Sequence, residues 1–133
     1  NLQGVKQIMK ALRAGEATIV LPDHVPNPLE GGEGVWVDFF GKPAYTMTLA
    51  GKLAQVKNVR ALFFVGERLP NGRGFALHVA PVSGCFNGDK AHDARVINRN
   101  VEYWVRRFPS QYLFAYNRYK HPFGAVESPE MRS

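Results

Sequence analysis

The chain has 133 residues, 45% of them apolar and 21% charged, which is typical of one folded domain and excludes a disordered chain. Its formal net charge is +6, and it contains no run of about 18 apolar residues that would span a membrane. Cys85 is the single cysteine, so the sequence excludes an intrachain disulfide and a cysteine-based zinc site.

The positive charge is concentrated in the second half of the sequence. Residues 89–121 contain seven Lys and Arg residues against three Asp and Glu residues. Such an excess attracts phosphate groups, nucleic acid or an anionic membrane surface, and it also suits a basic helix that is simply solvated. Both interpretations stay open on charge alone.

The first predicted element is an amphipathic helix that begins almost at the first residue. Its apolar residues recur at spacings of three and four: Leu2, Val5, Ile8, Met9 and Leu12. Gly15 follows at a position where helices end in a left-handed residue. Because the sequence opens directly in this helix, without an initiator Met, we expect the chain to be part of a longer protein.

Two short strands are predicted next. The apolar run 17–21 suits a strand buried on both faces, and Pro22 ends it. A long loop rich in Pro, Gly and acidic residues leads to Gly34, and 35–40 is typical of a second strand. The "GGEG" at 31–34 does not lead into a helix, so we interpret it as a flexible loop and not as a phosphate-binding one.

A second helix and a hairpin follow. The helix is predicted over 46–58, with Thr46 or Thr48 near its N-cap. The runs 61–69 and 75–81, separated by an Asn-Gly turn, predict an antiparallel hairpin.

The longest helix is predicted over about 90–108, where Pro109 ends it. Strand, helix and strand in the first half of the chain predict a right-handed parallel βαβ unit, to which the hairpin adds an antiparallel strand. The predicted fold class is therefore α/β, with a mixed sheet flanked by helices.

Asp23 and His24 are the first candidate site residues, because they directly follow the predicted strand and Pro22. Ligands of parallel α/β sheets bind beyond the carboxyl ends of the strands. An acid at this point can orient a histidine, accept hydrogen bonds from substrate hydroxyls or hold an arginine. An Asx-type turn without chemistry explains the pair equally well.

The other histidines predict structure more than chemistry. His78 lies in an alternating strand, where a half-buried and hydrogen-bonded histidine is the usual finding. His92 and Asp93 fall in the first turn of the long helix, where an acid favours the positive end of the helix dipole, so we expect a capping role. No phosphate loop, nucleophile elbow or dinucleotide motif is present, and we predict no metal site and no cofactor.

The segment "YNRYKHP" interleaves Arg118 and Lys120 with Tyr116 and Tyr119. Arginine grips a phosphate bidentately and lysine adds a point charge. The same pattern suits single-stranded nucleic acid, whose bases stack on aromatic rings. The aromatic spacing suits packing as well, and no RNP1-type or GXXG motif accompanies it.

Four segments are distinctive in combination: "GEATIVLPDHVPNP", "GVWVDFFGKPAYTMTLAGKLA", "ERLPNGRGFALHVAP" and "NRNVEYWVRRFPSQYLFAYNRYK". In this order they resemble the C-terminal half of the late lipid A biosynthesis acyltransferases, the lauroyl and myristoyl transferases of Gram-negative bacteria. The resemblance covers about Leu2 to Pro122 and is greatest with the beta-proteobacterial lauroyl transferases. It divides the chain into 1–122, the C-terminal portion of the acyltransferase domain, and 123–133, a flexible tail.

The resemblance implies transfer of a fatty acyl chain, in these relatives lauroyl, from acyl carrier protein to a hydroxyacyl chain of Kdo-lipid IVA, a phosphorylated glucosamine disaccharide. It implies action on the anionic surface of the cell inner membrane, at its cytoplasmic face, and no nucleic-acid partner. The implied fold is that of the glycerolipid acyltransferases. The implied chemistry uses a His-x4-Asp/Glu dyad as the general base that takes the hydroxyl proton during attack on the thioester.

That dyad and the usual membrane anchor belong to the N-terminal half of the family, outside the resemblance. In this chain, the positions five residues after the four histidines hold no acid; they are Leu29, Ser83, Ile97 and Val126. We therefore expect the chain alone to have no transferase activity. The alternatives to an acyltransferase part are a basic nucleic-acid-binding module and a purely structural fragment.

The resemblance also assigns the candidate residues. Asp23 matches the acid of the family's Pro-Asp-His/Gln motif, which implies a supporting role in the acceptor or catalytic pocket. We expect His24, the next residue, to help bind the substrate. Arg118 and Lys120 match the C-terminal basic motif, and we interpret them as ligands of an acceptor phosphate, with structural anchoring as the alternative. The loop 25–34 is longer and richer in proline than the family's glycine-containing turn.

Overall fold

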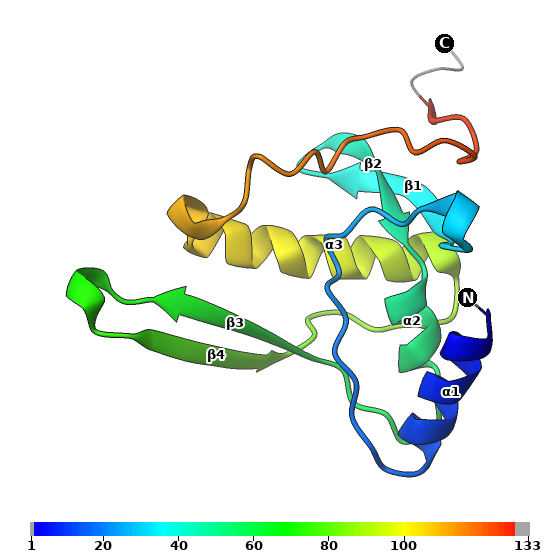
Figure 1. Ribbon diagram of the computed structural model, residues 1–133, viewed down its shortest axis with the longest axis horizontal. Coiled ribbons are helices and arrows are strands. Elements are labelled where there is room, and N and C mark those ends of the chain that lie inside the picture. The colour runs from blue at the N-terminus through cyan, green and yellow to red at the C-terminus, as the bar shows by residue number, and fades with distance from the viewer. Residues whose placement is uncertain (1, 130–133) are drawn as a thin grey trace.

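The computed structural model describes residues 2–129, in which the longest helix lies between two β-hairpins (Figure 1). The helices and strands are α1 (Leu2–Arg13), β1 (Gly34–Phe39), β2 (Lys42–Met47), α2 (Leu49–Ala54), β3 (Leu62–Arg68), β4 (Phe75–Pro81) and α3 (Lys90–Arg107). Single 3-10 turns occupy Pro28–Glu30, Pro70–Gly72 and Pro109–Gln111. Each hairpin is a separate two-stranded antiparallel sheet. The predicted mixture of helices and strands is therefore confirmed.

The core lies where α3 packs on the first hairpin. Its buried residues come from β1, β2 and one face of α3: Phe39, Ala44, Ile97, Val101 and Val105. Phe63 of β3 packs against the same cluster from the second hairpin. Helix α3, predicted from its apolar face, therefore joins two hairpins that share no strand pairing among the described residues.

The first hairpin contains one predicted strand, β1, and one that the sequence did not indicate, β2. Phe39 pairs with Lys42, so only Phe40 and Gly41 form the turn. Both have positive φ, 49° and 76°, which is the type I′ geometry that suits a twisted hairpin. Phe40 replaces the usual Asn or Asp, and its N–H donates to Glu102 Oε1 at 2.7 Å. Tertiary contacts thus hold a turn that local sequence does not favour.

The second hairpin confirms its prediction. Strands β3 and β4 pair from Leu62 opposite Pro81 to Arg68 opposite Phe75. Asn71 adopts φ 57° in the connecting loop, as the Asn-Gly signal requires.

The predicted strand over 17–21 and the parallel βαβ unit are wrong for the described residues. Residues 17–21 form no strand, and Ile19 and Leu21 are 70% and 69% exposed. Strand β3 pairs only with β4, in antiparallel orientation. The composition of 17–21 suits a strand, but a strand forms only where a partner lies within hydrogen-bonding distance.

The predicted helices form, with corrections at one helix's bounds and at one cap. The helix predicted over 46–58 covers only Leu49–Ala54, because Thr46 and Met47 belong to β2. Thr48 occupies the N-cap of α2, and α1 is a helix although it has no buried residue. At the start of α3, Asp89 is the N-cap, because its Oδ1 accepts from the His92 N–H at 2.7 Å. Asp93, expected to cap, is buried and instead accepts from the backbone of the preceding loop.

Glu33 ties the loop before β1 to two helices. Its carboxylate accepts hydrogen bonds from Thr48 Oγ1 at 2.7 Å, from Lys52 Nζ at 3.5 Å and from Lys90 Nζ. The hydrogen bond from Lys90, then that from Thr48, lowers the pKa of Glu33 from 4.5 to about 2. The ionised carboxylate is thus favoured by the folded chain.

Because its pKa is lowered on folding, Glu33 stabilises the fold above about pH 4.5, and this contribution is lost as the pH falls toward about 2. We expect Glu33→Gln to lower the free energy of unfolding at pH 7 by at most about 1 kcal/mol, since the pair is partly exposed and screened. Urea unfolding from pH 2 to pH 7 should show the variant and the parent converging at the acid end. Glu30→Gln changes an exposed carboxylate and is the control, so its free energy of unfolding should follow that of the parent at every pH. A difference in free energy between Glu33→Gln and the parent that is as large at pH 2 as at pH 7 would contradict the assignment.

Candidate functional site

The candidate site is the turn that carries Asp23 and His24. The turn follows the extended segment 17–21, and the His24 N–H reaches back to the Leu21 carbonyl at 3.4 Å. Asp23 is half-buried and His24 is exposed. No hydrogen bond reaches the Asp23 carboxylate from the described residues, so the acid keeps its acceptor positions available. An Asx-type capping role would need such a hydrogen bond.

Tyr116 connects the C-terminal segment to this turn. Its hydroxyl accepts from the N–H of the buried Val25 at 2.9 Å. Its ring lies 5.6 Å from the His24 ring, and Lys120 Nζ lies 5.2 Å from its centroid. His24 and Lys120, which are 96 positions apart, therefore share one aromatic neighbour. Sequence alone gave Tyr116 no role in the site and indicated it only as an aromatic residue beside Arg118. Its position two residues before Arg118 is the one sequence feature that could have indicated such a role.

Arg118 lies inside the protein, with 3% of its surface exposed. Its Nη1 donates to the Tyr45 carbonyl at 2.9 Å, and its Nη2 donates to Thr46 Oγ1 at 2.8 Å and to Asn98 Oδ1 at 3.2 Å. The guanidinium also lies 5.0 Å from the Phe39 ring centroid. Of the two interpretations that the sequence left open for Arg118, these contacts support structural anchoring.

Charge links Asp23 to the buried arginine. Burial lowers the pKa of Arg118, and the charges of nearby groups, Asp23 among them, act in the opposite direction. Burial raises the pKa of Tyr112, and the negative charge of Asp23 raises it further. Asp23, Tyr112 and Arg118 are therefore electrostatic neighbours, and a neutral phenol stands beside the carboxylate at ordinary pH.

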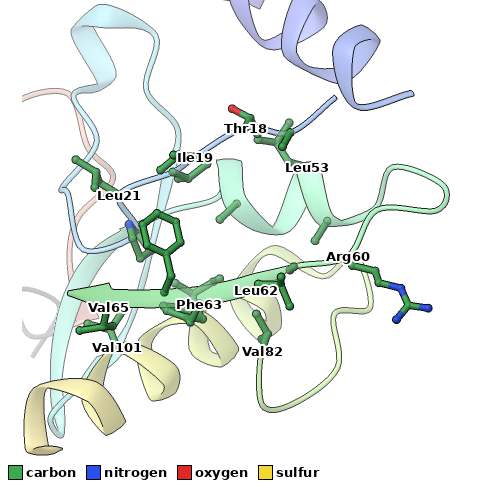
Figure 2. Close-up of a pocket in the computed structure, with 18 of the residues that line it drawn as sticks. Thr18, Ile19, Leu21, Leu53, Arg60, Leu62, Phe63, Val65, Val82 and Val101 are labelled. Atoms are coloured by element: carbon green, nitrogen blue, oxygen red, sulfur yellow. The ribbon is translucent and has the colours of Figure 1, made fainter. Parts of the chain in front are cut away.

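An apolar groove leads away from Asp23. It encloses a cavity of about 530 Å³ between the segment 17–21 and strand β3, with α3 as its floor (Figure 2). Its lining includes Ile19, Leu21, Leu53, Phe63, Val65 and Val101. Asp23 and Tyr112 also line it. An acid thus lies at one end of a large apolar space.

The remaining histidines have structural partners. His78 Nε2 lies 2.8 Å from Glu67 Oε2 and packs beside Trp104 and Phe108, as expected of a half-buried strand histidine. His92 Nε2 lies 2.8 Å from the Cys85 carbonyl. Across residues 2–129, no three His, Cys, Asp or Glu side chains gather as metal ligands, and no helix is long and apolar enough to cross a membrane.

The last part of the chain is described only to residue 129. Trp36 Nε1 donates to the Val126 carbonyl at 2.7 Å, and Ser128 is buried. Of the predicted flexible tail, 130–133 lie outside the described residues. The domain boundary after 122 stays a prediction.

Arg118→Lys tests the anchoring role. A lysine cannot reproduce the fork that reaches three acceptors on β2 and α3, so buried acceptors lose their partners. We expect the free energy of unfolding to fall by about 3 kcal/mol, two charged hydrogen bonds being lost. Chemical denaturation measures this. Lys120→Ala removes a neighbouring, less buried cation and should cost less than about 1 kcal/mol; equal effects of the two variants would rule out anchoring.

Comparison with known proteins places the chain in a family. Residues 1–121 match the family described as bacterial lipid A biosynthesis acyltransferase. The chain is similar to a lipid A biosynthesis lauroyltransferase of Escherichia coli, 31% identical over 118 residues that make up 87% of this chain and 38% of the relative. It is also similar to a lipid A biosynthesis acyltransferase of Haemophilus influenzae, 28% identical over 112 residues, 84% of this chain and 34% of the relative. The chain spans little more than a third of the length of these relatives, and it belongs to the bacterial lipid A biosynthesis acyltransferase family.

Proposed function

We propose that this chain is the acceptor-side part of an acyltransferase that moves a fatty acyl chain from an acyl carrier protein thioester to a hydroxyacyl chain of Kdo-lipid IVA. The family supports the class of reaction, and the similarity to a lauroyltransferase of Escherichia coli supports lauroyl as the chain transferred. The observation that carries the proposal is the half-buried Asp23 carboxylate, free of hydrogen bonds from the described residues, at the end of the apolar groove.

The reaction needs a general base, an oriented hydroxyl and a leaving thiol. The acceptor hydroxyl oxygen attacks the thioester carbonyl, the C–S bond breaks, and the thiolate leaves and takes up a proton while the ester forms. The general base removes the hydroxyl proton, and we assign it to the family's His-x4-Asp/Glu dyad outside this chain. Asp23 then acts as a supporting acid that orients an incoming group by accepting its hydrogen bond.

We assign the basic residues of this region, Arg118, Lys120 and His24, to two different roles. Arg118 is committed to protein acceptors, so we assign it to holding the C-terminal segment in place. Lys120 and His24 lie around Tyr116 with no ion-pair partner among the described residues, and we assign them to an acceptor phosphate. A lysine ammonium without an ion-pair partner can bind such an anion as a point charge.

The surroundings that we propose are the cytoplasmic face of the inner membrane. Arg95, Arg99 and Arg107 lie exposed on α3, without an acidic partner within the described part of the chain. Such a surface is attracted to anionic lipid headgroups. A nucleic-acid-binding module, the alternative that charge alone allowed, is not favoured, because the family match explains the same basic segment.

The test uses a joined protein in which residues 1–121 of this chain replace the matched region of the Escherichia coli relative. We expect the joined protein to acylate Kdo-lipid IVA from lauroyl-acyl carrier protein and the 133-residue chain alone to show no turnover. Asp23→Asn in the joined protein should lower kcat about 100-fold, a size typical of a group that supports acid–base catalysis.

Asp38→Asn is the matched control, because Asp38 is an exposed carboxylate on β1 away from the groove. It should leave kcat unchanged. Turnover by the 133-residue chain, or equal kcat for the Asp23 variant and the parent, would reject the proposed roles.

A further inference from the structure

Tyr112 has a hydroxyl group that the protein leaves without a hydrogen-bond partner. Its ring packs against the core cluster and meets the Phe114 ring edge-on, at a centroid distance of 5.0 Å. Its N–H donates to the Pro109 carbonyl at 3.4 Å, and its carbonyl accepts from the Phe114 N–H at 2.9 Å. Within residues 2–129, no group donates to the phenol oxygen or accepts from it. The ring is therefore fixed while the hydroxyl stays available.

Two other tyrosines of the C-terminal segment use their hydroxyls inside the protein. The Tyr116 hydroxyl accepts from the Val25 N–H at 2.9 Å, and the Tyr119 hydroxyl donates to the Phe39 carbonyl at 2.7 Å. A partly buried phenol usually finds such a partner, because an unsatisfied hydroxyl costs free energy inside a protein. Tyr112 departs from this pattern, and its hydroxyl is a candidate ligand-binding group.

Tyr112 lies beside Asp23. Both residues line the apolar groove, and Tyr112 also borders a second cavity of about 610 Å³ between Phe40 and the C-terminal segment. Burial raises the pKa of Tyr112, and the negative charge of Asp23 raises it further, whereas the charge of Arg118 acts in the opposite direction. The phenol therefore keeps its proton beside the carboxylate.

Contacts inside this chain fix the two residues relative to each other. The hydrogen bond between Tyr116 and Val25 holds the turn two residues after Asp23. Arg118 anchors the same C-terminal segment on β2 and α3. Tyr112 lies between the end of α3 and these two anchors, with its ring on the core. The juxtaposition of the carboxylate and the phenol is thus built by residues of this chain.

The two groups have complementary hydrogen-bonding properties. A charged carboxylate only accepts hydrogen bonds, and a neutral phenol donates its one proton. A ligand that satisfies both must donate one hydrogen bond and accept another, as an alcohol hydroxyl does. A phosphate oxygen is repelled by the carboxylate, an ammonium group cannot accept, and a hydrocarbon chain does neither. The pair therefore selects a hydroxyl group.

We propose that Asp23 and Tyr112 together bind one hydroxyl group of the acyl acceptor, which donates to the Asp23 carboxylate and accepts from the Tyr112 phenol. The identity of the acceptor rests on the proposed function, in which it is a phosphorylated glucosamine disaccharide with hydroxyacyl chains. The bound hydroxyl differs from the attacking one, because the attacking hydroxyl gives its proton to the general base. It comes from the disaccharide or from a second hydroxyacyl chain, and it sets the acceptor in place for the attack.

Tyr112→Phe removes the hydroxyl and keeps the ring that packs on the core. In the joined protein we expect its kcat/KM for Kdo-lipid IVA to fall at least about 10-fold, the size typical of one hydrogen bond to a charged or partly buried group. KM for lauroyl-acyl carrier protein should stay unchanged, because the donor does not contact the phenol. An unchanged kcat/KM for the acceptor would overturn the proposal.

Tyr45→Phe is the matched control. Tyr45 is buried on β2, its hydroxyl also has no hydrogen-bond partner within the described chain, and it lines neither the groove nor the second cavity. This variant should leave kcat/KM unchanged. Equal losses in the two variants would reveal a general effect of removing a hydroxyl and would contradict the proposal. Lower thermal stability of Tyr112→Phe at unchanged kcat/KM would assign the phenol to a protein partner instead.

Coupling between Asp23→Asn and Tyr112→Phe shows whether the two groups share one ligand. If both bind the same hydroxyl, the double variant should lose less kcat/KM than the product of the two single losses. A loss equal to that product would mean that the groups act independently, and the pairing would be wrong.

Two analogues of the acceptor identify which hydroxyl is bound. One lacks a free hydroxyl of the disaccharide, and the other lacks the hydroxyl of a second acyl chain. The parent should use the analogue without the bound hydroxyl at least about 10-fold less efficiently than Kdo-lipid IVA, since Asp23 and Tyr112 are then left unpaired. Tyr112→Phe should discriminate against that analogue less. Unaltered discrimination against both analogues would exclude a hydroxyl at this point.

A measurement on the 133-residue chain tests the juxtaposition without activity. NMR of isotopically labelled tyrosine follows the ionisation of each phenol separately. Asp23→Asn should lower the pKa of Tyr112, because it removes a nearby negative charge. Asp38→Asn, on β1 away from the groove, should leave that pKa unchanged. An unchanged pKa in Asp23→Asn would separate the phenol from the carboxylate and reject the site. The other ionisable neighbours of Tyr112 are the same in all three proteins: Arg118, Tyr116 and Tyr119.

The proposed function and the hydroxyl site fail separately. If the joined protein shows no turnover, acyl transfer is rejected, and its binding of Kdo-lipid IVA then decides the site. A Kd at least about 10-fold weaker for Tyr112→Phe keeps the hydroxyl site, and an equal Kd rejects it. Turnover with unchanged kinetics in Tyr112→Phe keeps the function and rejects the hydroxyl site.

Discussion

A guanidinium taken out of water needs acceptors for its N–H groups. The two terminal nitrogens of Arg118 find them on two separate elements, while its buried Nε has no hydrogen-bond partner among the described residues. The terminal nitrogens donate to the Tyr45 carbonyl and Thr46 hydroxyl of β2 and to the Asn98 amide oxygen of α3. Asn98 in turn donates to Thr46 and to the Asp38 carbonyl of β1. Since an unpaired buried cation is costly, this network fixes the C-terminal segment on the interface between the first hairpin and α3.

The candidate site depends on that network indirectly, through Tyr116. With Arg118 held, Tyr116 lies where its hydroxyl accepts from the Val25 N–H, and the turn of Asp23 and His24 is positioned from behind. The charge of Asp23 reaches Arg118 and Tyr112 without a hydrogen bond to either. The scaffold thus supplies a positioned acid whose acceptor positions stay open, which suits a supporting group more than a complete catalytic unit.

The two hairpins differ in how far their apolar side chains are buried. The first hairpin packs its apolar face against α3. Strand β3 covers α3 with Phe63 and exposes Leu62 and Phe64 on its other face. The segment 17–21 lies across the groove from β3, apolar and without backbone partners. Local propensity and tertiary pairing disagree at the groove beside Asp23, as they also do at the Phe40–Gly41 turn of the first hairpin.

Periodicity and caps by themselves determined α1, α3 and the hairpin of β3 and β4, because spacing along the chain reports directly on a helix face or an Asn-Gly turn. The sequence also indicated Asp23 as a residue at the end of an extended segment. Only the tertiary structure decided that β2 pairs through Phe40 and Gly41, that 17–21 stays unpaired and that Arg118 is buried. Strand pairing and the burial of a cation depend on groups distant in sequence, so no local pattern contains them.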